Sequence, residues 1–264
     1  MNSKLKLAGL GAIAAIAAAS PFVLKLETPT AIAAAPATGG FSSAQKTELE
    51  GIIKAYILEH PEVLMESVNN YRSTEEKKQN DQAAQALKDN SDAFLKSSHL
   101  PDVGNKNADV TIVEFFDYNC GYCKQGFEAV QQGLNEDKNL RFVFIDLPIL
   151  SESSTTASRF ALAAQKQNKY FELHRALMTF KGPKTEESIL KLAKDAGLDV
   201  EKLKVDEKSP DVDEAIKKNQ ELAQKLAING TPAFIVGEEL IRGYIPYPAM
   251  KTLIEKQRAD KKKG

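Results

Sequence analysis

The two cysteines of this 264-residue chain, Cys120 and Cys123, lie three positions apart in the stretch VEFFDYNCGYC. A disulfide stabilises a protein mainly by closing a loop in the unfolded chain, and a loop this short removes little entropy. A structural staple is therefore a poor explanation for the pair. Thiol–disulfide exchange explains it better, because that chemistry needs one thiol that ionises easily and a second that resolves the mixed disulfide.

The residues around the cysteines predict the elements that position them. Residues 108–116 are apolar nearly throughout and predict a buried strand. A helix is expected to begin near Cys120, with an apolar face made of Cys123, Phe127, Val130 and Leu134. Cys123 is then buried, and Cys120 lies at the exposed first turn, where free N–H groups and the helix dipole stabilise a thiolate. Residues 140–150 predict a second buried strand, which completes a βαβ unit with parallel strands.

Glu114 is an acid inside the otherwise apolar first strand, six residues before Cys120. Burying a carboxylate is costly unless it has a partner or a function. Glu114 is therefore a candidate proton relay during attack by Cys123. The alternative is an ordinary residue at the edge of a sheet.

The dipeptide Thr231-Pro232 stands at the start of another predicted strand, Ala233–Val236. Proline is unusual in this position because it removes a backbone donor from the strand ladder. A cis peptide bond here would turn the Thr231 backbone outward, where it pairs with an extended substrate chain. The residues alone favour the ordinary trans form.

The remaining elements predict an α/β protein. Residues 152–226 read as a series of helices. Gly237 then predicts a tight turn between the strands Ala233–Val236 and Glu239–Arg242, and residues 246–258 predict a final helix.

Residues 41–98 read as a helical arm ahead of this domain. Ser42 or Ser43 caps its first helix, and His60-Pro61 interrupts it. Its apolar stripe consists of Leu49, Ile52, Ile53, Tyr56 and Ile57 and, after the interruption, Val63, Leu64, Val68 and Tyr71. After Arg72 the sequence is polar and has little to bury. An apolar stripe needs a partner, which is either the main domain of the same chain or the arms of other copies.

Residues 1–33 are typical of an export signal. Lys4 and Lys6 precede a short apolar region, Leu7–Ala19, and small-residue cleavage sites follow near Ala33–Ala35. A cut after Ala19 and a retained N-terminal anchor are the alternatives. Export to the periplasm places the protein in an oxidising compartment, where two cysteines on one short motif suggest a redox centre.

Composition excludes several other classes of function. The formal net charge of −1 does not indicate a nucleic-acid partner. The three histidines, His60, His99 and His174, have no metal-ligand spacing with the cysteines and are expected to be surface or packing residues. We therefore expect no metal or other cofactor besides the redox-active Cys120–Cys123 disulfide.

Together these features resemble the DsbA-like branch of the thioredoxin superfamily. EFFDYNCGYC is similar to that family's acid, paired aromatics and active-site signature, and GTPAF is similar to its cis-proline loop. The resemblance covers residues 100–260 and implies a thioredoxin fold with an all-helical insertion at residues 152–226, preceded by the helical arm. It also implies that Pro232 is cis and faces the cysteines, against the expectation from the residues alone.

Finer features of the resemblance point to one subgroup. The dipeptide Gly121-Tyr122 and the residue Thr231 replace the Pro-His and Val of the family's strong oxidases and are similar to its disulfide isomerases. The arm resembles the N-terminal region of suppressor-of-copper-sensitivity C (ScsC) proteins, whose stalk makes a trimer. The resemblance thus implies a trimeric, exported isomerase of cysteine-containing secreted proteins, which a membrane-bound thiol–disulfide reductase keeps reduced. The alternatives are a monomeric dithiol oxidase and a Cu(I)-binding copper-tolerance protein.

Overall fold

The computed structural model describes residues 40–97 and 99–262 of the chain. The expected signal peptide, residues 1–33, lies outside the described residues. The chain falls into two units, with the break at Pro61. Within the described ranges, no helix has both the length and the apolar character needed to cross a membrane.

In the first unit, α1 (Ser43–Glu59) begins with a capping box. The Gln45 N–H donates to Ser42 Oγ, and the Ser42 N–H donates to Gln45 Oε1. This cap satisfies backbone donors that a helix start leaves free. Every side chain of α1 is exposed, including the predicted apolar stripe. The helix ends just before His60, where the sequence predicted the interruption.

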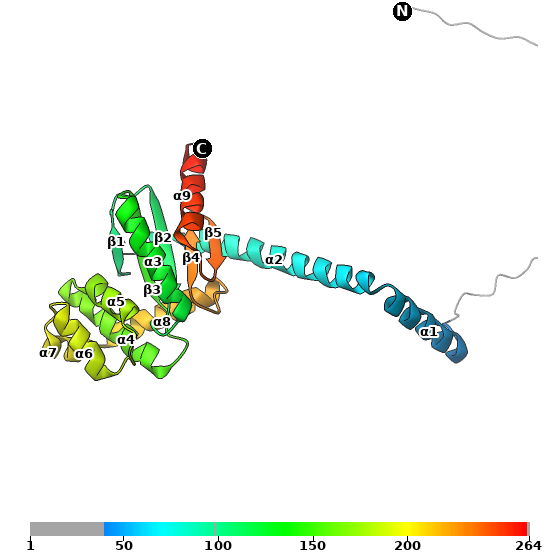
Figure 1. The fold of residues 1–264 in the computed structure, drawn as a ribbon, viewed down its shortest axis with the longest axis horizontal. Coiled ribbons are helices and arrows are strands. Elements are labelled where there is room, and N and C mark those ends of the chain that lie inside the picture. Colours follow the sequence, from blue (N-terminus) through cyan, green and yellow to red (C-terminus); the bar gives the residue numbers. More distant parts are fainter. Residues whose placement is uncertain (1–39, 98, 263–264) are drawn as a thin grey trace, which may run out of the picture. The chain divides into compact units, whose positions relative to one another are not determined.

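The second unit is built on a five-stranded sheet with the order β1-β3-β2-β4-β5 (Figure 1). Its strands are β1 (Asp102–Gly104), β2 (Val110–Phe116), β3 (Leu140–Asp146), β4 (Ala233–Val236) and β5 (Glu239–Arg242). β2 and β3 run parallel, and the other neighbours are antiparallel. The helix α3 (Gly121–Glu136) connects the parallel pair, which confirms the predicted βαβ unit.

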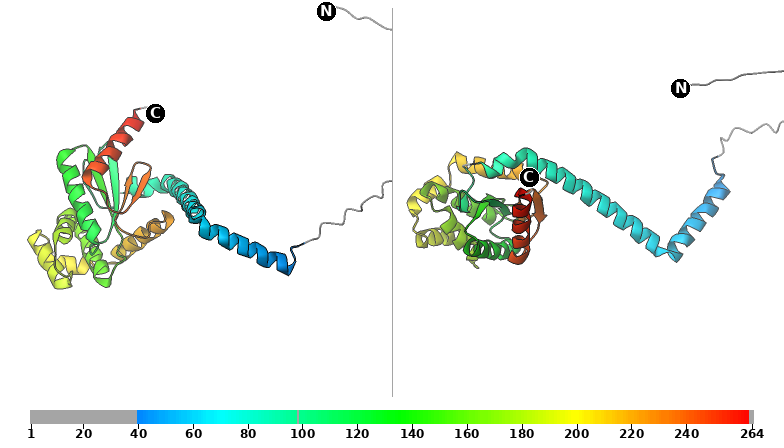
Figure 2. Two further views of the ribbon diagram at one scale, coloured as in Figure 1. Left: turned by 45° about the vertical axis from the view of Figure 1, so that its right-hand side comes forward. Right: turned by 90° about the horizontal axis from the view of Figure 1, so that it is seen from above.

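Helices flank this sheet, and most of them come from the insertion after β3 (Figures 1 and 2). They are α4 (Glu152–Ala164), α5 (Tyr170–Thr179), α6 (Glu186–Asp195), α7 (Val200–Asp206) and α8 (Pro210–Lys225), with a 3-10 turn at Gln165–Gln167. A further helix, α9 (Tyr247–Lys261), follows β5. The helical insertion expected over residues 152–226 is therefore present, and the fold is the DsbA-like thioredoxin fold.

Alternation along β2 gives the sheet two separate cores. Ile112 and Phe116 belong to the core shared with α3, α9 and much of the insertion. Val113 and Phe115 belong to the core on the opposite face. Glu114 has the same parity as Ile112 and Phe116, so its side chain points to the face that α3 covers.

The opposite face is covered by α8 and by the end of α2 (Pro61–Leu95). Our expectation that the chain after Arg72 has little to bury is wrong. Three side chains of this part of α2 are buried: Ala83, Leu87 and Phe94. Leu87 and Phe94 join the same core as Val113. The first part of α2 instead keeps large apolar side chains exposed, namely Val63, Leu64, Met65 and Tyr71.

Candidate active site

The two cysteines occupy the start of α3, as predicted. Cys120 is the N-cap residue, and the Cys123 N–H donates to Cys120 Sγ at 3.3 Å. In its protonated form, the Cys120 thiol donates in turn to the carbonyl oxygen of Thr231, also 3.3 Å away. Both cysteines are free thiols. The site is thus built from two distant parts of the chain, the start of α3 and the loop that precedes β4.

Cys120 is more covered than the sequence predicted. We expected it at an exposed turn, but only 7% of its surface is accessible, while Cys123 is fully buried. The exposed part of the motif is the dipeptide between them, Gly121 and Tyr122, with 63% of Tyr122 accessible. A reaction partner therefore reaches the Cys120 sulfur beside this dipeptide.

The Thr231-Pro232 peptide bond is cis, as the family resemblance implied and the residues alone did not. Pro232 is buried and Thr231 is half-buried, and the Thr231 carbonyl oxygen lies beside the Cys120 sulfur. The Gly243 N–H donates to the Pro232 carbonyl at 2.8 Å. This bond ties the loop to the chain that leaves β5.

The surroundings of the two thiols separate their acidities. The hydrogen bond from the Cys123 thiol has the largest effect on Cys120, and together with backbone N–H groups at the helix start it lowers the pKa of Cys120 to about 6. Burial raises the pKa of Cys123 far above its ordinary value, and the Cys120 hydrogen bond and the charge of Glu114 act in the same direction. At neutral pH, Cys120 is therefore the thiolate, and Cys123 keeps its proton.

Glu114 is fully buried in β2, between β3 and β4, so the alternative of an edge residue is wrong. Neither carboxyl oxygen has a hydrogen-bond partner among the described residues. A Cβ on Gly126 of α3 would lie 3.4 Å from Glu114 Oε1, which places the carboxyl directly beneath the cysteine helix. Burial raises the pKa of Glu114 well above its ordinary value, and nearby Cys120 adds to the rise. A carboxyl in this state can exchange a proton with Cys123.

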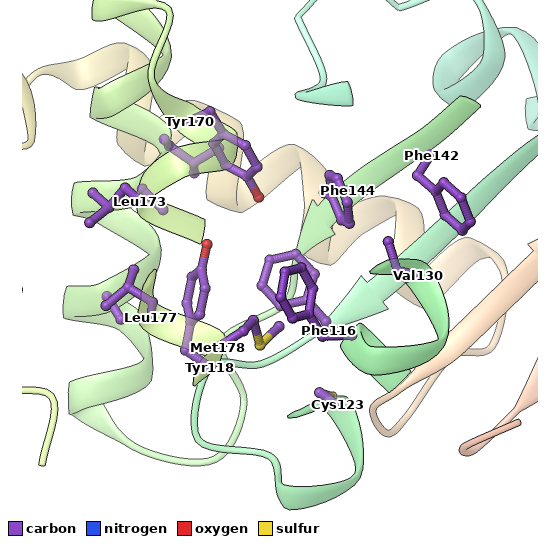
Figure 3. Packing of buried hydrophobic residues seen from close by; sticks show 14 of the residues in the cluster. Phe116, Tyr118, Cys123, Val130, Phe142, Phe144, Tyr170, Leu173, Leu177 and Met178 are labelled. Atoms are coloured by element: carbon purple, nitrogen blue, oxygen red, sulfur yellow. The ribbon is translucent and has the colours of Figure 1, made fainter. Parts of the chain in front are cut away.

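A cluster of aromatic side chains packs near the buried cysteine (Figure 3). At its centre, the ring of His174 contacts six others: Phe116, Tyr118, Phe127, Phe144, Tyr170 and Phe171. His174 Nδ1 lies 3.1 Å from the Tyr118 hydroxyl, and burial lowers the pKa of His174 to about 3, so the ring is neutral. His174 is thus a packing residue. Among residues 40–97 and 99–262, no group of three or more His, Cys, Asp or Glu side chains could hold a metal ion.

Two buried acids near the site were not singled out from the sequence. Asp117 lies in the loop between β2 and α3, and Asp146 ends β3. The Tyr170 hydroxyl donates to Asp146 Oδ2 at 2.7 Å, and burial raises the pKa of Asp146 to about 7. Their position in the sequence could have identified them, because both stand where a buried parallel strand ends. This is the edge of the sheet at which the functional sites of α/β proteins lie.

Two family models match this chain. The DSBA-like thioredoxin domain matches residues 111–255, which include Glu114, both cysteines and the cis proline. The copper resistance protein ScsC N-terminal domain matches residues 45–78, which span most of α1 and the first part of α2.

Solved structures and curated proteins agree with these matches. A thioredoxin-like oxidoreductase from Silicibacter pomeroyi DSS-3 is 40% identical, with a TM-score of 0.62 over 64% of this chain and 97% of that chain. Proteus mirabilis ScsC in a transitional conformation is 27% identical, with a TM-score of 0.62 over 83% of this chain and all of that one (100%). Disulfide bond formation protein D of Bacillus subtilis (strain 168) is 26% identical over 60% of this chain and 76% of its own length. The chain spans only 21% of another relative, the Na(+)/H(+) antiporter NhaA 1 of Salinispora arenicola (strain CNS-205).

Proposed function

This chain belongs to the family of DSBA-like thioredoxin domains, and from that premise we propose that it is an exported disulfide isomerase of cysteine-containing secreted proteins. Membership supports thiol–disulfide oxidoreductase activity in general. The observation that carries the proposal is the contrast between the two thiols: Cys120 is acidic and borders the surface, and Cys123 is sealed and protonated.

Exchange begins when the Cys120 thiolate attacks one sulfur of a substrate disulfide. A mixed disulfide forms, and the other substrate sulfur leaves as a thiolate. Two routes then release the enzyme. Cys123 can lose its proton, with Glu114 as the acceptor, and attack Cys120, which leaves the substrate reduced and the Cys120–Cys123 pair oxidised. Alternatively, another substrate thiolate attacks the substrate sulfur, which forms a new substrate disulfide and returns Cys120 as a thiolate.

The raised pKa of Cys123 favours the second route. A thiol that keeps its proton attacks slowly, so the mixed disulfide lives longer and a substrate thiol has time to attack. The dipeptide Gly121-Tyr122 and Thr231 agree with this direction, since no histidine stands between the cysteines to stabilise the thiolate further. An isomerase works only in the reduced state, and we propose a membrane-bound thiol–disulfide reductase as its electron donor.

The arm suits an assembly of several such sites. The exposed apolar stripe of α1 lies within the segment that matches the ScsC N-terminal domain. Burying such a stripe against copies of itself removes apolar surface from water, so we propose a homotrimer formed through the arm. Several thiols then act on one trapped substrate.

Reactivation of scrambled, fully oxidised ribonuclease tests the proposal. The reduced protein is expected to restore ribonuclease activity, and the Cys120→Ala variant is not. Absence of recovery above that control rules out the isomerase. Oxidation of a reduced peptide without recovery of scrambled ribonuclease identifies a dithiol oxidase instead. Tight Cu(I) binding against a competing chelator, without redox turnover, identifies a copper-binding protein.

A further inference from the structure

Asp117 is a fully buried acid three residues before Cys120, and its carboxylate joins two loops. Oδ1 accepts from the Asn119 N–H at 2.7 Å and from the Ser154 hydroxyl at 2.8 Å. Oδ2 accepts from the N–H groups of Ile149 and Leu150 at 2.9 and 3.1 Å. The first partner belongs to the cysteine loop, and the other three belong to the segment that leads from β3 into α4.

The backbone of Asp117 also touches the cysteine pair. The Cys120 N–H donates to the Asp117 carbonyl at 3.0 Å. Although burial dominates and raises the pKa of Cys123, the Asp117 backbone N–H opposes that rise, so it faces the Cys123 sulfur. A shift of this one residue therefore moves the hydrogen-bonding groups around both thiols.

A second contact reinforces the link between the same two loops. The Asn119 side-chain Nδ2 lies within 2.9 Å of the hydroxyls of Ser151, Ser153 and Ser154. Ser151 also caps α4, because its hydroxyl accepts from the Ser154 N–H. The loop that ends in Cys120 is thus fastened at two positions to the start of the helical insertion.

We propose that Asp117 is a positioning residue for disulfide exchange: it fastens the Cys120 loop to the Ile149–Ser154 segment and so holds the sulfur against the donors at the start of α3. All four of its partners are donors, so both side-chain oxygens of Asp117 act as acceptors. Asparagine at this position would turn an NH₂ group toward at least one of these donors and leave it unpaired in a buried place. The role is independent of the direction of exchange, so it stands whether the protein is an isomerase or an oxidase.

The test uses the full-length reduced protein and the Asp117→Asn variant. The first readout is the pH profile of Cys120 alkylation by iodoacetamide, and the second is the equilibrium of the Cys120–Cys123 pair with glutathione. A loosened loop stabilises the thiolate less, so the alkylation midpoint is expected to move to higher pH. The pair should also become harder for glutathione to reduce, with an equilibrium constant changed by about fivefold or more.

Asp137→Asn is the matched control, because Asp137 is a structural acid at the far end of α3 that accepts from Arg258 Nη1 at 2.7 Å. It is expected to lower the melting temperature and leave both readouts unchanged. If Asp117→Asn does the same, Asp117 is merely structural and the proposal is overturned. If Asp117→Asn does not fold, Ser154→Ala decides: removing one of the four bonds should move both readouts in the same direction by about twofold, and unchanged readouts overturn the proposal.

Discussion

The Cys120 thiol and the Thr231 carbonyl oxygen lie 3.3 Å apart, although 111 positions separate them in the sequence. This contact sets the reactive sulfur against the backbone that leads into β4. In the proposed reaction, a substrate chain that pairs with this backbone brings its own sulfur to Cys120. The same contact also explains why so little of the thiol is accessible.

The acidity of Cys120 should appear directly in its reactivity. Because the pKa of Cys120 is lowered to about 6 and that of Cys123 is raised, alkylation of the reduced protein is expected to involve Cys120 alone. The rate should rise with pH around a midpoint near 6 and be flat above pH 8. Mass spectrometry of iodoacetamide-treated samples between pH 4 and 9 measures both (about 1 pH unit of precision suffices). A rate that still climbs at pH 8 to 9 contradicts the prediction.

Tyr122, one of the two residues between the cysteines, should tune the pKa of the Cys120 thiol further. Tyr122→His places an imidazolium at the exposed start of α3, and its charge is expected to lower the pKa of Cys120 by about 1. The reduced form is then more stable and the protein more oxidising. Tyr122→Phe is the control, since it keeps the ring and adds no charge. Equal equilibrium constants with glutathione for Tyr122→His and Tyr122→Phe would contradict this prediction.

Glu114→Gln should separate the two steps of the reaction. Release of a mixed disulfide by Cys123 is expected to slow by at least ~10-fold, because glutamine cannot accept the Cys123 proton. The first attack by Cys120 should change little. Stopped-flow measurement of both steps with a peptide disulfide checks this. If both steps keep their wild-type rates, Glu114 is not the acceptor of the Cys123 proton.

The same variant should also alter stability with a defined pH dependence. The folded state holds the Glu114 proton more tightly than the unfolded state does, so the wild-type protein loses stability as pH rises above the unfolded pKa. Glu114→Gln has no such loss. Its melting temperature should therefore exceed that of the wild type increasingly toward neutral pH. A melting-temperature difference that stays constant between pH 4 and 8 would argue against a buried acid with a raised pKa.

Asp146 gives a similar effect in a narrower window. Burial raises its pKa from 3.8 to about 7, so its contribution to stability is lost as pH rises between these values. This pKa shift corresponds to a loss of at most roughly 4 kcal/mol in the free energy of unfolding. Asp146→Asn keeps an acceptor for the Tyr170 hydroxyl and should flatten this part of the pH profile. Urea unfolding at pH 4 and pH 7 measures the free energy of unfolding of Asp146→Asn relative to that of the wild type. This difference, variant minus wild type, should be larger at pH 7.

The proposed assembly depends on one face of α1. The substitution Ile53→Asp, in the middle of the stripe, is expected to convert the oligomer to a monomer, because a charge at such an interface is costly to bury. Leu58→Asp is the control, since at about 100° per residue Leu58 lies on the opposite side of α1. Light scattering gives the mass of each form. Identical masses for wild type and Ile53→Asp exclude the stripe as the interface.

Local patterns predicted the catalytic half of the molecule. The apolar strand before Cys120 and the four-three-four spacing after it define strand and helix without long-range information. The family resemblance added the cis form of Pro232, which depends on tertiary contacts that residue types do not show.

Features that depend on distant partners were missed. Cys120 was expected to be exposed because Thr231, which covers it, is remote in sequence. β1 has only three residues, too few for a periodic signal. Leu87 and Phe94 stand in a polar stretch, where a few buried side chains are hard to distinguish from an unpartnered helix.

Leu87 and Phe94 set the position at which the catalytic domain can be separated from the arm. Leu87 and Phe94 share a core with Val113 and Phe115, in the strand that leads to Cys120. Removing the whole arm up to residue 98 would expose the part of this core that α2 covers and leave only α8 and the chain after it on that side of the sheet. A shortened protein that begins at about residue 80 keeps the part of α2 that carries Leu87 and Phe94, and this core stays covered.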